Sequence, residues 1–528
     1  MNSRAFDVVI VGSGPAGTSA AYPLVEAGLD VLMVDGGKTA LNFPPENKYL
    51  DERQFSQRQW EWIIGKDFHA LRHKNAVSPK LRSPTHDYVF SGFNEFNQIR
   101  YEKFIGVGSL ARGGLSNAWG CGVARLSHED LDKYPVDRNK MFDSYQIVAR
   151  RIGISGAVAD DLSEYFGVDD WSQPPVEMDS LNRSLYAKYQ IRNRQLNRKG
   201  FRLGRARVAV LSEPKAGRSA CDLSNNCLWG CDNKSLYSAE YEIDTLQRAK
   251  NFTFESGCLV QSVDREGDAV MLNATRENEK VKIRAKKVIL AAGTLATTGI
   301  VLRALDRELS VNVKSCPNGA FILWLPQMLG KPRENGFGLG QLAFSMTLDR
   351  GENVFGSTFS TLGIPVTEFS RYLPLTRRNG IGLLSNLLGS CLVANLFLSG
   401  ELSSSSASID KDGFLAIKGG HKKEVDELMA EAKRRLADCF RKLGAVMLPK
   451  SFTQGEAGGD IHYSGTLPMK NSPMLGETSS IGEVEGLPDV YVVDGACLPE
   501  LTEKSHTLTI MANADRISRE IVRRFVLN

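Results

Sequence analysis

The chain has little net charge, few histidines and few cysteines for its length. Its 528 residues include seven histidines and nine cysteines, and the formal charge is +4 at pH 7. So small a charge, without a lysine–arginine stripe interleaved with aromatics, does not indicate nucleic-acid binding. Seven scattered histidines also do not suit a multi-histidine metal site. The length allows two to four domains.

The sequence also lacks a secretory signal and, with one exception, a long apolar run. It enters a strand pattern within "MNSRAFDVVIVG", which leaves no room for a signal peptide. An odd number of cysteines then favours free thiols in a reducing compartment, so we expect a cytoplasmic protein. Residues 381–398 carry no charge and approach the length of a membrane span. Their Ser, Asn and Gly favour a buried element, and peripheral contact with a membrane or a lipid-linked substrate is the alternative.

A dinucleotide-binding turn stands near the N-terminus. The apolar strand 8–11 runs into Gly12-Ser13-Gly14-Pro15-Ala16-Gly17, a helix-like stretch follows, and a second strand is closed by Asp35. Gly12 permits the tight turn, Gly14 lets backbone approach a pyrophosphate, and Gly17 lets the helix pack on the strand. The helix N-terminus faces the phosphates, and Asp35 is placed to accept hydrogen bonds from ribose hydroxyls. The motif alone does not separate FAD from NAD.

A second glycine-rich stretch spans residues 106–126, "GVGSLARGGLSNAWGCGVARL". Glycine is costly to order, so this density suggests backbone lying against a flat or bulky group. Leu110, Leu115, Trp119 and Val123 are interspersed with the glycines, which does not fit a flexible loop.

Four blocks together resemble the glucose–methanol–choline (GMC) family of flavoprotein oxidoreductases. They are "VVIVGSGPAGTSAA", "GGLSNAWGCG", "KKVILAAGTLATTGIVLRA", and the C-terminal pair "IHYSGTLPM" and "VYVVDGACLPELTEKSHTLTIMANADRISREIV". Their order and spacing match along nearly the whole chain, and residues 317–455 match loosely. The resemblance implies bound FAD and oxidation of an alcohol. Two positions depart from it, since Cys121 stands where the family often has glycine and Asp35 replaces the usual glutamate.

The resemblance also implies which residues contact FAD. The first turn supplies one group, the second glycine-rich stretch another, and the later blocks the rest. The expected set is Gly12, Gly14, Pro15, Ala16, Gly17, Asp35, Gly113, Gly114, Ser116, Asn117, Trp119, Val260, Ala292, Gly293, Asp494, Gly495, Thr507 and Leu508.

Two histidines lie in matched blocks. His462 opens an H-x-x-G-T block and His506 precedes a T-x-T-I block. Alcohol oxidation removes the hydroxyl proton and passes the carbinol hydride to flavin N5. A neutral imidazole can take that proton, and a second can hold the same oxygen in place. We predict that His462 is the base and His506 its orienting partner, with the roles exchangeable. The other histidines, among them His69, His73, His86 and His128, lie in polar stretches and are expected at the surface.

Three cysteines fall within eleven residues, Cys221, Cys227 and Cys231. Thiolates at such spacing can converge on a soft-metal site. The segment is similar to one in flavin-dependent glucose and fructose dehydrogenases that holds a [3Fe-4S] cluster, which passes electrons from flavin to an outside acceptor. Such a cluster would imply an acceptor protein or a quinone as partner. Reduced structural thiols, or a disulfide, are the alternative.

The expected fold class is α/β, with a Rossmann-like FAD-binding domain and an α+β substrate domain. The FAD-binding domain would be discontinuous, over residues 1–135, 200–316 and 456–528. The substrate-binding domain would span 317–455, as an antiparallel sheet backed by helices. Apolar residues at helical spacing predict one of these helices near 425–443. Residues 136–199 would form a connecting or cap segment.

The expected activity is FAD-dependent oxidation of an alcohol group on a sugar or sugar-like polyol, by a dehydrogenase or an oxidase. A hydrophobic or lipid-linked alcohol is an alternative substrate. An NAD-dependent oxidoreductase would need another dinucleotide turn, and the sequence has none of comparable quality. A redox-silent binding protein with this fold would have damaged flavin blocks or lack the histidines, whereas His462 and His506 are both present.

Overall fold

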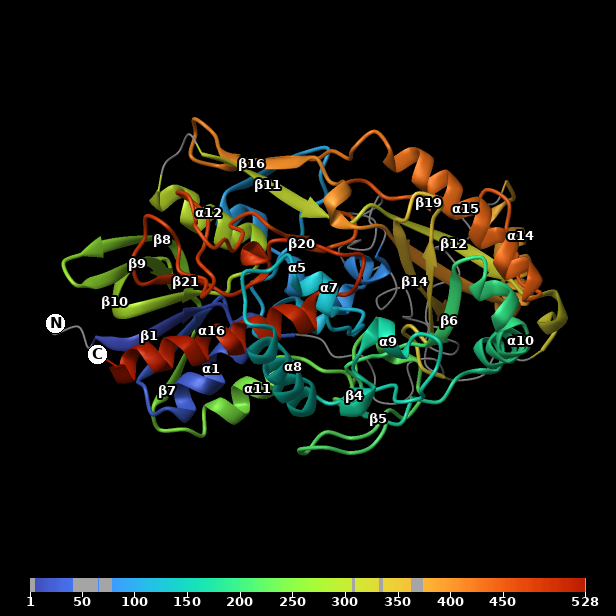
Figure 1. The fold of residues 1–528 in the computed structure, drawn as a ribbon, viewed down its shortest axis with the longest axis horizontal. Helices are drawn as coiled ribbons and strands as arrows, with labels where there is room; N and C mark the ends of the chain where they lie inside the picture. The colour runs from blue at the N-terminus through green and yellow to red at the C-terminus, as the bar shows by residue number, and fades with distance from the viewer. Residues whose placement is uncertain are drawn as a thin grey trace.

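Three main sheets organise the computed structural model, which describes residues 5–40, 65, 78–305, 309–331, 336–361 and 374–527. One seven-stranded sheet lies near the two termini, a second lies at the far end of the molecule, and a five-stranded sheet runs along one side (Figure 1). The predicted α/β class with a Rossmann-like domain and a second antiparallel sheet is confirmed.

The first sheet has the order β7-β2-β1-β10-β9-β8, and β21 pairs with β10. Its central strand reads FDVVIV and is buried on both faces, as expected of a strand inside a parallel sheet. The parallel strands are β1 (Phe6–Val11), β2 (Val31–Asp35), β7 (Phe252–Ser256), the end of β10 (Glu279–Leu290) and β21 (Val490–Val492). β8 (Cys258–Glu266) and β9 (Ala269–Arg276) form an antiparallel meander with the start of β10.

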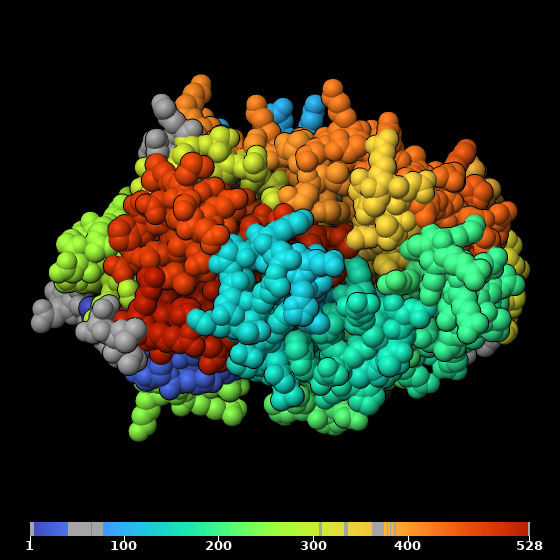
Figure 2. All heavy atoms as spheres, in the orientation of Figure 1, coloured from blue at the N-terminus to red at the C-terminus, as the bar shows by residue number. Residues whose placement is uncertain are grey.

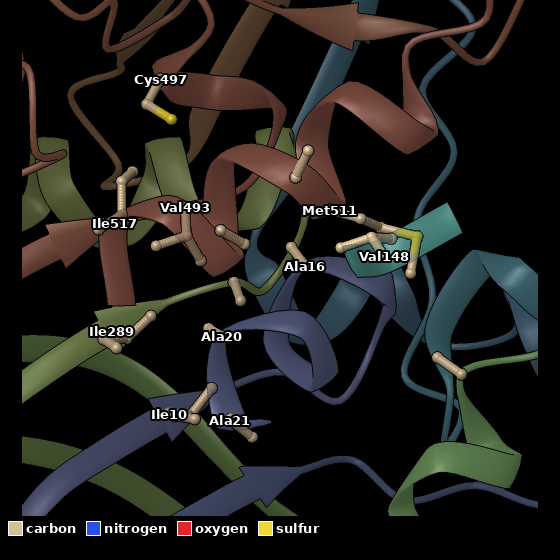
Figure 3. Packing of buried hydrophobic residues seen from close by; sticks show 14 of the residues in the cluster. Ile10, Ala16, Ala20, Ala21, Val148, Ile289, Val493, Cys497, Met511 and Ile517 are labelled. Carbon is tan, nitrogen blue, oxygen red and sulfur yellow. The ribbon is translucent and has the colours of Figure 1, made fainter. Parts of the chain in front are cut away.

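Three helices share one apolar cluster with this sheet: α1 (Pro15–Glu26), α8 (Arg138–Ile152) and α16 (Thr507–Leu527). α16 packs against both α1 and α8. Figure 3 shows why α1 and α16 approach closely, because α1 presents the small side chains of Ala16 and Ala20 within the cluster that includes Met511 of α16. The C-terminal helix is thereby held directly over the N-terminal dinucleotide turn.

The second sheet is antiparallel, with the order β18-β12-β15-β14-β13-β6, and β19 pairs with β12. Its helices α10 (Ser180–Asn197) and α15 (Val425–Lys442) share one apolar cluster with the strands, which confirms the predicted amphipathic helix. The strands are β6 (Phe201–Arg205), β12 (Asn318–Trp324), β13 (Leu342–Thr347), β14 (Asn353–Ser360), β15 (Cys391–Phe397), β18 (Val446–Met447) and β19 (Thr453–Gln454).

The remaining elements connect these two parts. The five-stranded sheet contains β20 (Tyr463–Ser464), β11 (Ser310–Ser315), β16 (Ser405–Ile409), β17 (Leu415–Lys418) and β3 (Ile99–Glu102), and β4 (Ile154–Ser155) pairs with β5 (Ser172–Gln173). The other helices are α5 (Asp87–Phe90), α6 (Phe93–Asn97), α7 (His128–Leu131), α9 (Ser163–Phe166), α11 (Glu240–Leu246), α12 (Thr294–Ala304) and α14 (Arg377–Leu387). Short 3-10 turns are η1 (Pro79–Arg82), η2 (Pro84–His86), η3 (Gly114–Asn117), η4 (Asp169–Trp171), η5 (Asn226–Leu228), η6 (Pro326–Met328), η7 (Leu388–Ser390), η8 (Gly400–Leu402) and η9 (Gly495–Cys497).

Segments far apart in the sequence share one surface. In Figure 2 the residues around 100–140 lie directly beside the C-terminal residues. Ion pairs join the two: Lys133 with Glu500 at 2.8 Å, and Lys140 with Glu520 at 2.6 Å. The N-terminal and C-terminal blocks of the sequence are therefore parts of one folded unit.

Two of the segments expected from the sequence contribute an element to the second sheet, although the rest of each segment lies outside that sheet. β6, from the 200–316 segment, is an edge strand of the second sheet. α10, from the 136–199 segment, packs on that same sheet through Leu185 and Leu196. Strand pairing and packing at a distance therefore divide these segments between the two parts of the molecule.

The uncharged stretch 381–398 forms two elements with different surroundings. β15 lies inside the second sheet with Leu392, Ala394 and Leu396 fully buried, as predicted. The preceding α14 leaves Leu383 half exposed, so the prediction of a buried element is wrong for this part. Among the described helices, none is long and apolar enough to cross a membrane.

The histidines expected at the surface are not all there. His128 is exposed, as predicted. His86 is buried, and its Nδ1 lies 3.0 Å from the Thr85 hydroxyl, so the surface prediction is wrong for this residue. The residues around His86 in the sequence are polar, and they gave no sign that His86 is buried. His69 and His73 lie outside the described residues.

Candidate active site

A cavity of about 490 Å³ lies between the first and second sheets. Residues at the carboxyl ends of four parallel strands line it: Gly12 after β1, Asp35 of β2, Ala291 after β10 and Asp494 after β21. Ligands bind at this edge in open α/β sheets. β12, β14 and β15 line the opposite wall.

The first turn needs glycine at three positions, for different reasons. Gly12 has φ +101°, and a Cβ there would lie 2.4 Å from the Ala291 carbonyl oxygen. A Cβ on Gly17 would lie 2.0 Å from the Gly12 oxygen, so α1 could not pack this closely on β1. At Gly14 a Cβ would meet no atom closer than 4.0 Å, and this residue lines the cavity. Gly14 thus leaves space for a ligand at the N-terminus of α1, where free N–H groups favour phosphate.

Asp35 closes the same end of the cavity. Its carboxylate accepts hydrogen bonds from the backbone N–H groups of Ser13, at 2.8 Å, and Gly37, at 2.6 Å. Burial raises the pKa of Asp35 to about 6, although these two N–H groups act in the opposite direction. The carboxylate is therefore held rigidly beside the turn, where it can also accept ribose hydroxyls.

The second glycine-rich stretch is fastened to the first. The Gly113 N–H donates to the Ser13 hydroxyl at 3.0 Å, and the Asn117 amide donates to the Arg112 carbonyl at 2.8 Å. Trp119 lines the cavity, and its indole N–H donates to the Tyr237 carbonyl at 2.9 Å. Cys121 has φ +57°, a left-handed conformation that favours glycine. The cysteine therefore occupies a position whose backbone suits the glycine that is common in the GMC family.

Asp494 joins two of the matched blocks. Its carboxylate accepts from the Gly293 N–H at 2.9 Å and the Thr297 hydroxyl at 2.5 Å, both at the start of α12. It also accepts from the Ala496 N–H at 3.0 Å, and burial raises its pKa to about 6. Gly293 has φ +87° and lines the cavity with no atom within 4 Å of a Cβ built there. This turn leaves a second stretch of bare backbone facing the cavity.

The structure brings His462 and His506 together in the cavity wall. Their ring centroids lie 4.9 Å apart, with planes at 77°. Burial lowers the pKa of His462 to about 4. It lowers the pKa of His506 well below the ordinary value, and the neighbouring His462 adds to this effect. Both imidazoles are therefore neutral at neutral pH, and a proton on one disfavours a proton on the other.

The loop that carries His462 is braced on both sides. β20 follows it and pairs with β11 through Tyr463 and Ser464. The Tyr463 hydroxyl donates to the carbonyl groups of Ile105 and Gly458, at 2.8 and 2.9 Å, and accepts from the Val107 N–H. His462 also contacts Phe397 of β15, with ring centroids 5.2 Å apart. The His462 imidazole is thus held between the five-stranded sheet, which contains β20, and the second sheet, which contains β15.

The cavity wall beside His462 is built from three cross-strand pairs of β14 and β15. They are Phe355 with Phe397, Ser357 with Asn395, and Phe359 with Val393, and all six residues line the cavity. The Asn395 side-chain oxygen accepts from the Ser357 N–H at 2.9 Å. The wall therefore offers an aromatic surface near His462, a polar pair beyond it and no charged side chain among these six.

Most of the predicted FAD contacts line the cavity, and four do not. Gly17 serves helix packing, Gly113 and Asn117 shape the second glycine-rich stretch, and Leu508 is in the core. Those that line it, with the two histidines, are Gly12, Gly14, Pro15, Ala16, Asp35, Gly114, Ser116, Trp119, Val260, Ala292, Gly293, Asp494, Gly495, Thr507, His462 and His506. Sequence reasoning missed Asp460 and the wall of β14 and β15. The acid two residues before His462 was a usable signal for Asp460, whereas the wall had none because its strands match the family only loosely.

The cysteine segment lies close to the same cavity. Cys227 is buried, Cys221 and Cys231 are half-buried, and all three are free thiols. Within the described chain, their sulfur atoms do not all lie within 4.8 Å of one another, so no mononuclear site is preformed. Lys80 is buried beside them and lines the cavity, and its Nζ donates to the Trp119 carbonyl at 2.6 Å. Burial lowers the pKa of Lys80, and the nearby thiols of Cys121, Cys227 and Cys231 act in the opposite direction.

These residues fit FAD. The bare backbone at Gly14 and Gly293 faces the cavity, and the Asp35 carboxylate stands where a ribose is expected. At the other end, the histidine pair and the start of α16 line the cavity, and Nδ1 of each histidine is buried without a hydrogen-bond partner. The positive end of the α16 dipole would favour a negatively charged ring there.

Known families match both ends of the chain. Residues 6–88 match the pyridine nucleotide-disulphide oxidoreductase family, and residues 410–514 match the GMC oxidoreductase family. The first match covers the dinucleotide turn and Asp35. The second covers the blocks of both His462 and His506.

Curated relatives align over nearly the whole chain. The chain is 23% identical to a paromamine 6'-oxidase from Streptomyces fradiae, over 98% of the chain and 92% of the relative. It is also 23% identical to a 2-methyl-1,2-propanediol dehydrogenase from Mycolicibacterium austroafricanum, over 98% and 95%. A 6'''-hydroxyparomomycin C oxidase from Streptomyces lividus is 24% identical, over 98% and 91%.

A solved structure has the same fold. The crystal structure of pyridoxine 4-oxidase from Mesorbium loti superposes with a TM-score of 0.60, at 15% sequence identity, and covers 98% of this chain and 99% of that one.

Proposed function

Since the chain belongs to the glucose–methanol–choline family of FAD-dependent oxidoreductases, we propose that it oxidises an alcohol group of a neutral sugar or sugar-like polyol. The observation that carries this proposal is the His462–His506 pair, 4.9 Å apart in the wall of a cavity that begins at a dinucleotide turn. The chain is thus an enzyme of the class that acts on alcohols, and bound FAD supplies the hydride acceptor.

The two imidazoles can share one substrate oxygen. Because burial keeps both rings neutral, each can accept a hydrogen bond or a proton from a hydroxyl in the cavity. In the proposed mechanism His462 takes the hydroxyl proton, and His506 holds the oxygen so that the carbinol carbon faces the hydride acceptor. Loss of a positioned base lowers a rate by about 10²–10⁴-fold.

The wall of β14 and β15 favours an uncharged substrate with both polar and apolar parts. Ser357 and Asn395 can bind a hydroxyl, and Phe355 and Phe397 can pack against a ring or carbon chain beside the reacting carbon. The names of the similar proteins refer to paromamine, 2-methyl-1,2-propanediol and pyridoxine. A cationic amino sugar would need carboxylates that these six wall residues do not provide. A hydrophobic alcohol is the second candidate, favoured by the aromatic side chains.

The histidine pair is tested by separate His462→Ala and His506→Ala variants, with His128→Ala as the control. His128 is also a histidine, but it is exposed and contacts the Phe142 ring edge to face, with ring centroids 4.7 Å apart. Anaerobic reduction of the bound flavin would be followed with glucose, 2-methyl-1,2-propanediol, pyridoxine and benzyl alcohol. We expect a loss of about 10²–10⁴-fold in the reduction rate for His462→Ala, with unchanged flavin content. Full activity in both active-site variants would contradict the proposal.

Electron transfer to a protein or quinone acceptor through a [3Fe-4S] cluster is a second proposal. Cys221, Cys227 and Cys231 would hold the cluster, and the buried Lys80 supports it because an anionic cluster would neutralise that ammonium. Lys80 forms no ion pair with a carboxylate in the part of the chain described. Iron and sulfide analysis of anaerobically purified protein tests this, with Cys439→Ser as the control variant. Iron-free protein would contradict the cluster and leave the alcohol oxidation unaffected.

A further inference from the structure

A buried carboxylate, that of Asp460, lies beside His462 in the cavity wall. The Asp460 side chain is fully buried, and its Oδ2 lies 3.8 Å from Nδ1 of His462. Oδ2 also accepts from the Cys316 N–H at 2.7 Å. Oδ1 of Asp460 and Nδ1 of His462 are both buried without a hydrogen-bond partner. A buried carboxylate oxygen and a buried ring nitrogen that both lack partners are unusual, because each one is costly.

The backbone between the two residues is strained so that they meet. Ile461 has φ +61°, which is a rare conformation for a β-branched residue. Such strain costs about 1–3 kcal/mol and tends to persist where function needs it. Here it lies directly between Asp460 and His462, and the Ile461 N–H is bonded to the Gly458 carbonyl at 3.1 Å. The turn therefore presents both side chains to the same region.

The proton on His462 has to be on one particular nitrogen for the ring to act as a base. About 23% of the His462 side chain is exposed, and the ring lines the cavity, while Nδ1 is enclosed. The accessible edge is therefore the Nε2 edge. A neutral imidazole carries one N–H, so Nε2 has a free lone pair only when Nδ1 is protonated. That Nδ1–H needs an acceptor, and the Asp460 carboxylate is in place to provide it.

We propose that Asp460 is a positioning residue that holds the ring proton of His462 on Nδ1 and thereby makes His462, rather than His506, the proton acceptor. This inference rests on the proposed function. The 3.8 Å separation is about 1 Å longer than a hydrogen bond. Nδ1 of His506 is buried as well, but no carboxylate lies within ion-pair distance of it among the described residues. The two histidines are therefore chemically different although their rings are close.

The ionisable groups around Asp460 predict how activity depends on pH. Burial raises the pKa of Asp460 to about 8, while the hydrogen bond from the Cys316 N–H acts in the opposite direction. The other titratable neighbours are Tyr463, whose pKa burial also raises, and beyond Cys316 the buried Glu503. A protonated Asp460 would donate to Nδ1 and leave the ring proton on Nε2, where it blocks the base. Activity should therefore rise as Asp460 loses its proton.

A metal ion is the competing explanation for the same geometry. The Cys316 sulfur, an Asp460 oxygen and a His462 nitrogen lie within 4.8 Å of one another. However, the Cys316 thiol donates to the Thr502 carbonyl at 3.4 Å, and burial raises its pKa well above the ordinary value. A protonated thiol is a poor ligand. Metal analysis of the holoenzyme separates the two explanations.

The test compares Asp460→Asn and Asp460→Glu with Glu503→Gln in the holoenzyme. Glu503 is also a buried acid of raised pKa, and it accepts from the Tyr165 hydroxyl at 3.1 Å without contacting His462. The direct readout is ¹⁵N NMR of histidine-labelled protein, with His462 assigned by its loss in His462→Ala. Protonated and bare ring nitrogens have distinct shifts. The wild type and Glu503→Gln should show a protonated Nδ1 and a bare Nε2 on the alkaline side of Asp460, and Asp460→Asn should lose this preference.

The kinetic readout uses the alcohol that reduces the flavin fastest among the four named above. Asp460→Asn should slow flavin reduction about 10²-fold, with little change in the alcohol's dissociation constant and loss of the acid limb of the pH profile. Asp460→Glu should restore part of the rate. An Nε2-protonated His462 in the alkaline wild type, an unaffected Asp460→Asn, or bound zinc that this variant loses would each overturn the inference. If no alcohol reduces the flavin, the proposed function fails, and the NMR result still decides the role of Asp460.

Discussion

Replacing Asp460 by asparagine should stabilise the folded protein at neutral and alkaline pH, although it slows the reaction. Burial raises the pKa of this carboxyl from 3.8 to about 8. A group whose folded pKa is raised contributes stability that is complete below its unfolded pKa and is lost as pH rises through the folded value. By pH 7 the wild type should have lost about 4 kcal/mol relative to acid conditions, and above pH 8 about 6 kcal/mol.

Asparagine at position 460 removes this loss of stability at high pH, and it adds a smaller destabilisation of its own. Its amide carries no charge at any pH, but its oxygen keeps the bond from the Cys316 N–H, which leaves the NH₂ group in the place of Oδ1, an atom that is buried without a partner. A buried donor without a good acceptor costs about 1–3 kcal/mol. The variant should therefore be slightly less stable than the wild type near pH 4 and about 1–3 kcal/mol more stable near pH 7. The difference between the two proteins should grow with pH over that window.

Thermal unfolding of the holoenzyme, followed by flavin fluorescence, measures this difference at several pH values. His462 and His506 add their own pH dependence, because their lowered pKa values remove stability as pH falls below about 6.5. The effect of His506 is common to both proteins, and His462 titrates below about pH 6.5, so the comparison is made above that pH as well as below it. Glu503→Gln shows what a change of buried acid to amide does elsewhere. A difference between Asp460→Asn and wild type that does not vary with pH would refute the reasoning.

Two further predictions concern the backbone. Gly14→Ala should keep its thermal stability without cofactor but bind FAD more weakly, because its Cβ enters the cavity. Gly17→Ala should unfold at a lower temperature, because its Cβ would lie 2.0 Å from the Gly12 oxygen. Equal effects of the two variants in flavin-binding and melting assays would contradict this prediction. Ile461→Asn should raise the free energy of unfolding by about 1 kcal/mol, since asparagine tolerates positive φ, and a lowered value in urea unfolding would show that Ile461 is not strained.

The local motifs were predictable because their chemistry depends on neighbours in the sequence. Gly12, Gly14 and Gly17 form one strand–turn–helix: a Cβ would clash at the turn position Gly12 and at the packing position Gly17, and Gly14 leaves bare backbone facing the cavity. The amphipathic pattern of α15 likewise predicted a helix whose apolar face is buried. The surroundings of His86 were not predictable, because burial depends on segments that fold over it.

The candidate site shows the same division. The motifs around His462 and His506 predicted that these two residues form a pair. Asp460 was only one of many polar residues in the sequence. Its meaning depends on the positive φ of Ile461 and on the Cys316 N–H, which lies just after β11 and 144 residues earlier in the chain. The wall of β14 and β15 had no sequence signal, because only strand register aligns Ser357 with Asn395.

The sequence by itself determined the dinucleotide turn, the acid at its second strand, the two histidines and the class of chemistry that such residues support. These depend on short stretches in which backbone conformation and residue type restrict each other. Only the tertiary structure decided which groups lie together: Asp460 beside His462, Lys80 among the thiols, and β6 in the second sheet. Contacts between distant segments depend on how strands pair and helices pack, and a local pattern of residues does not contain that information.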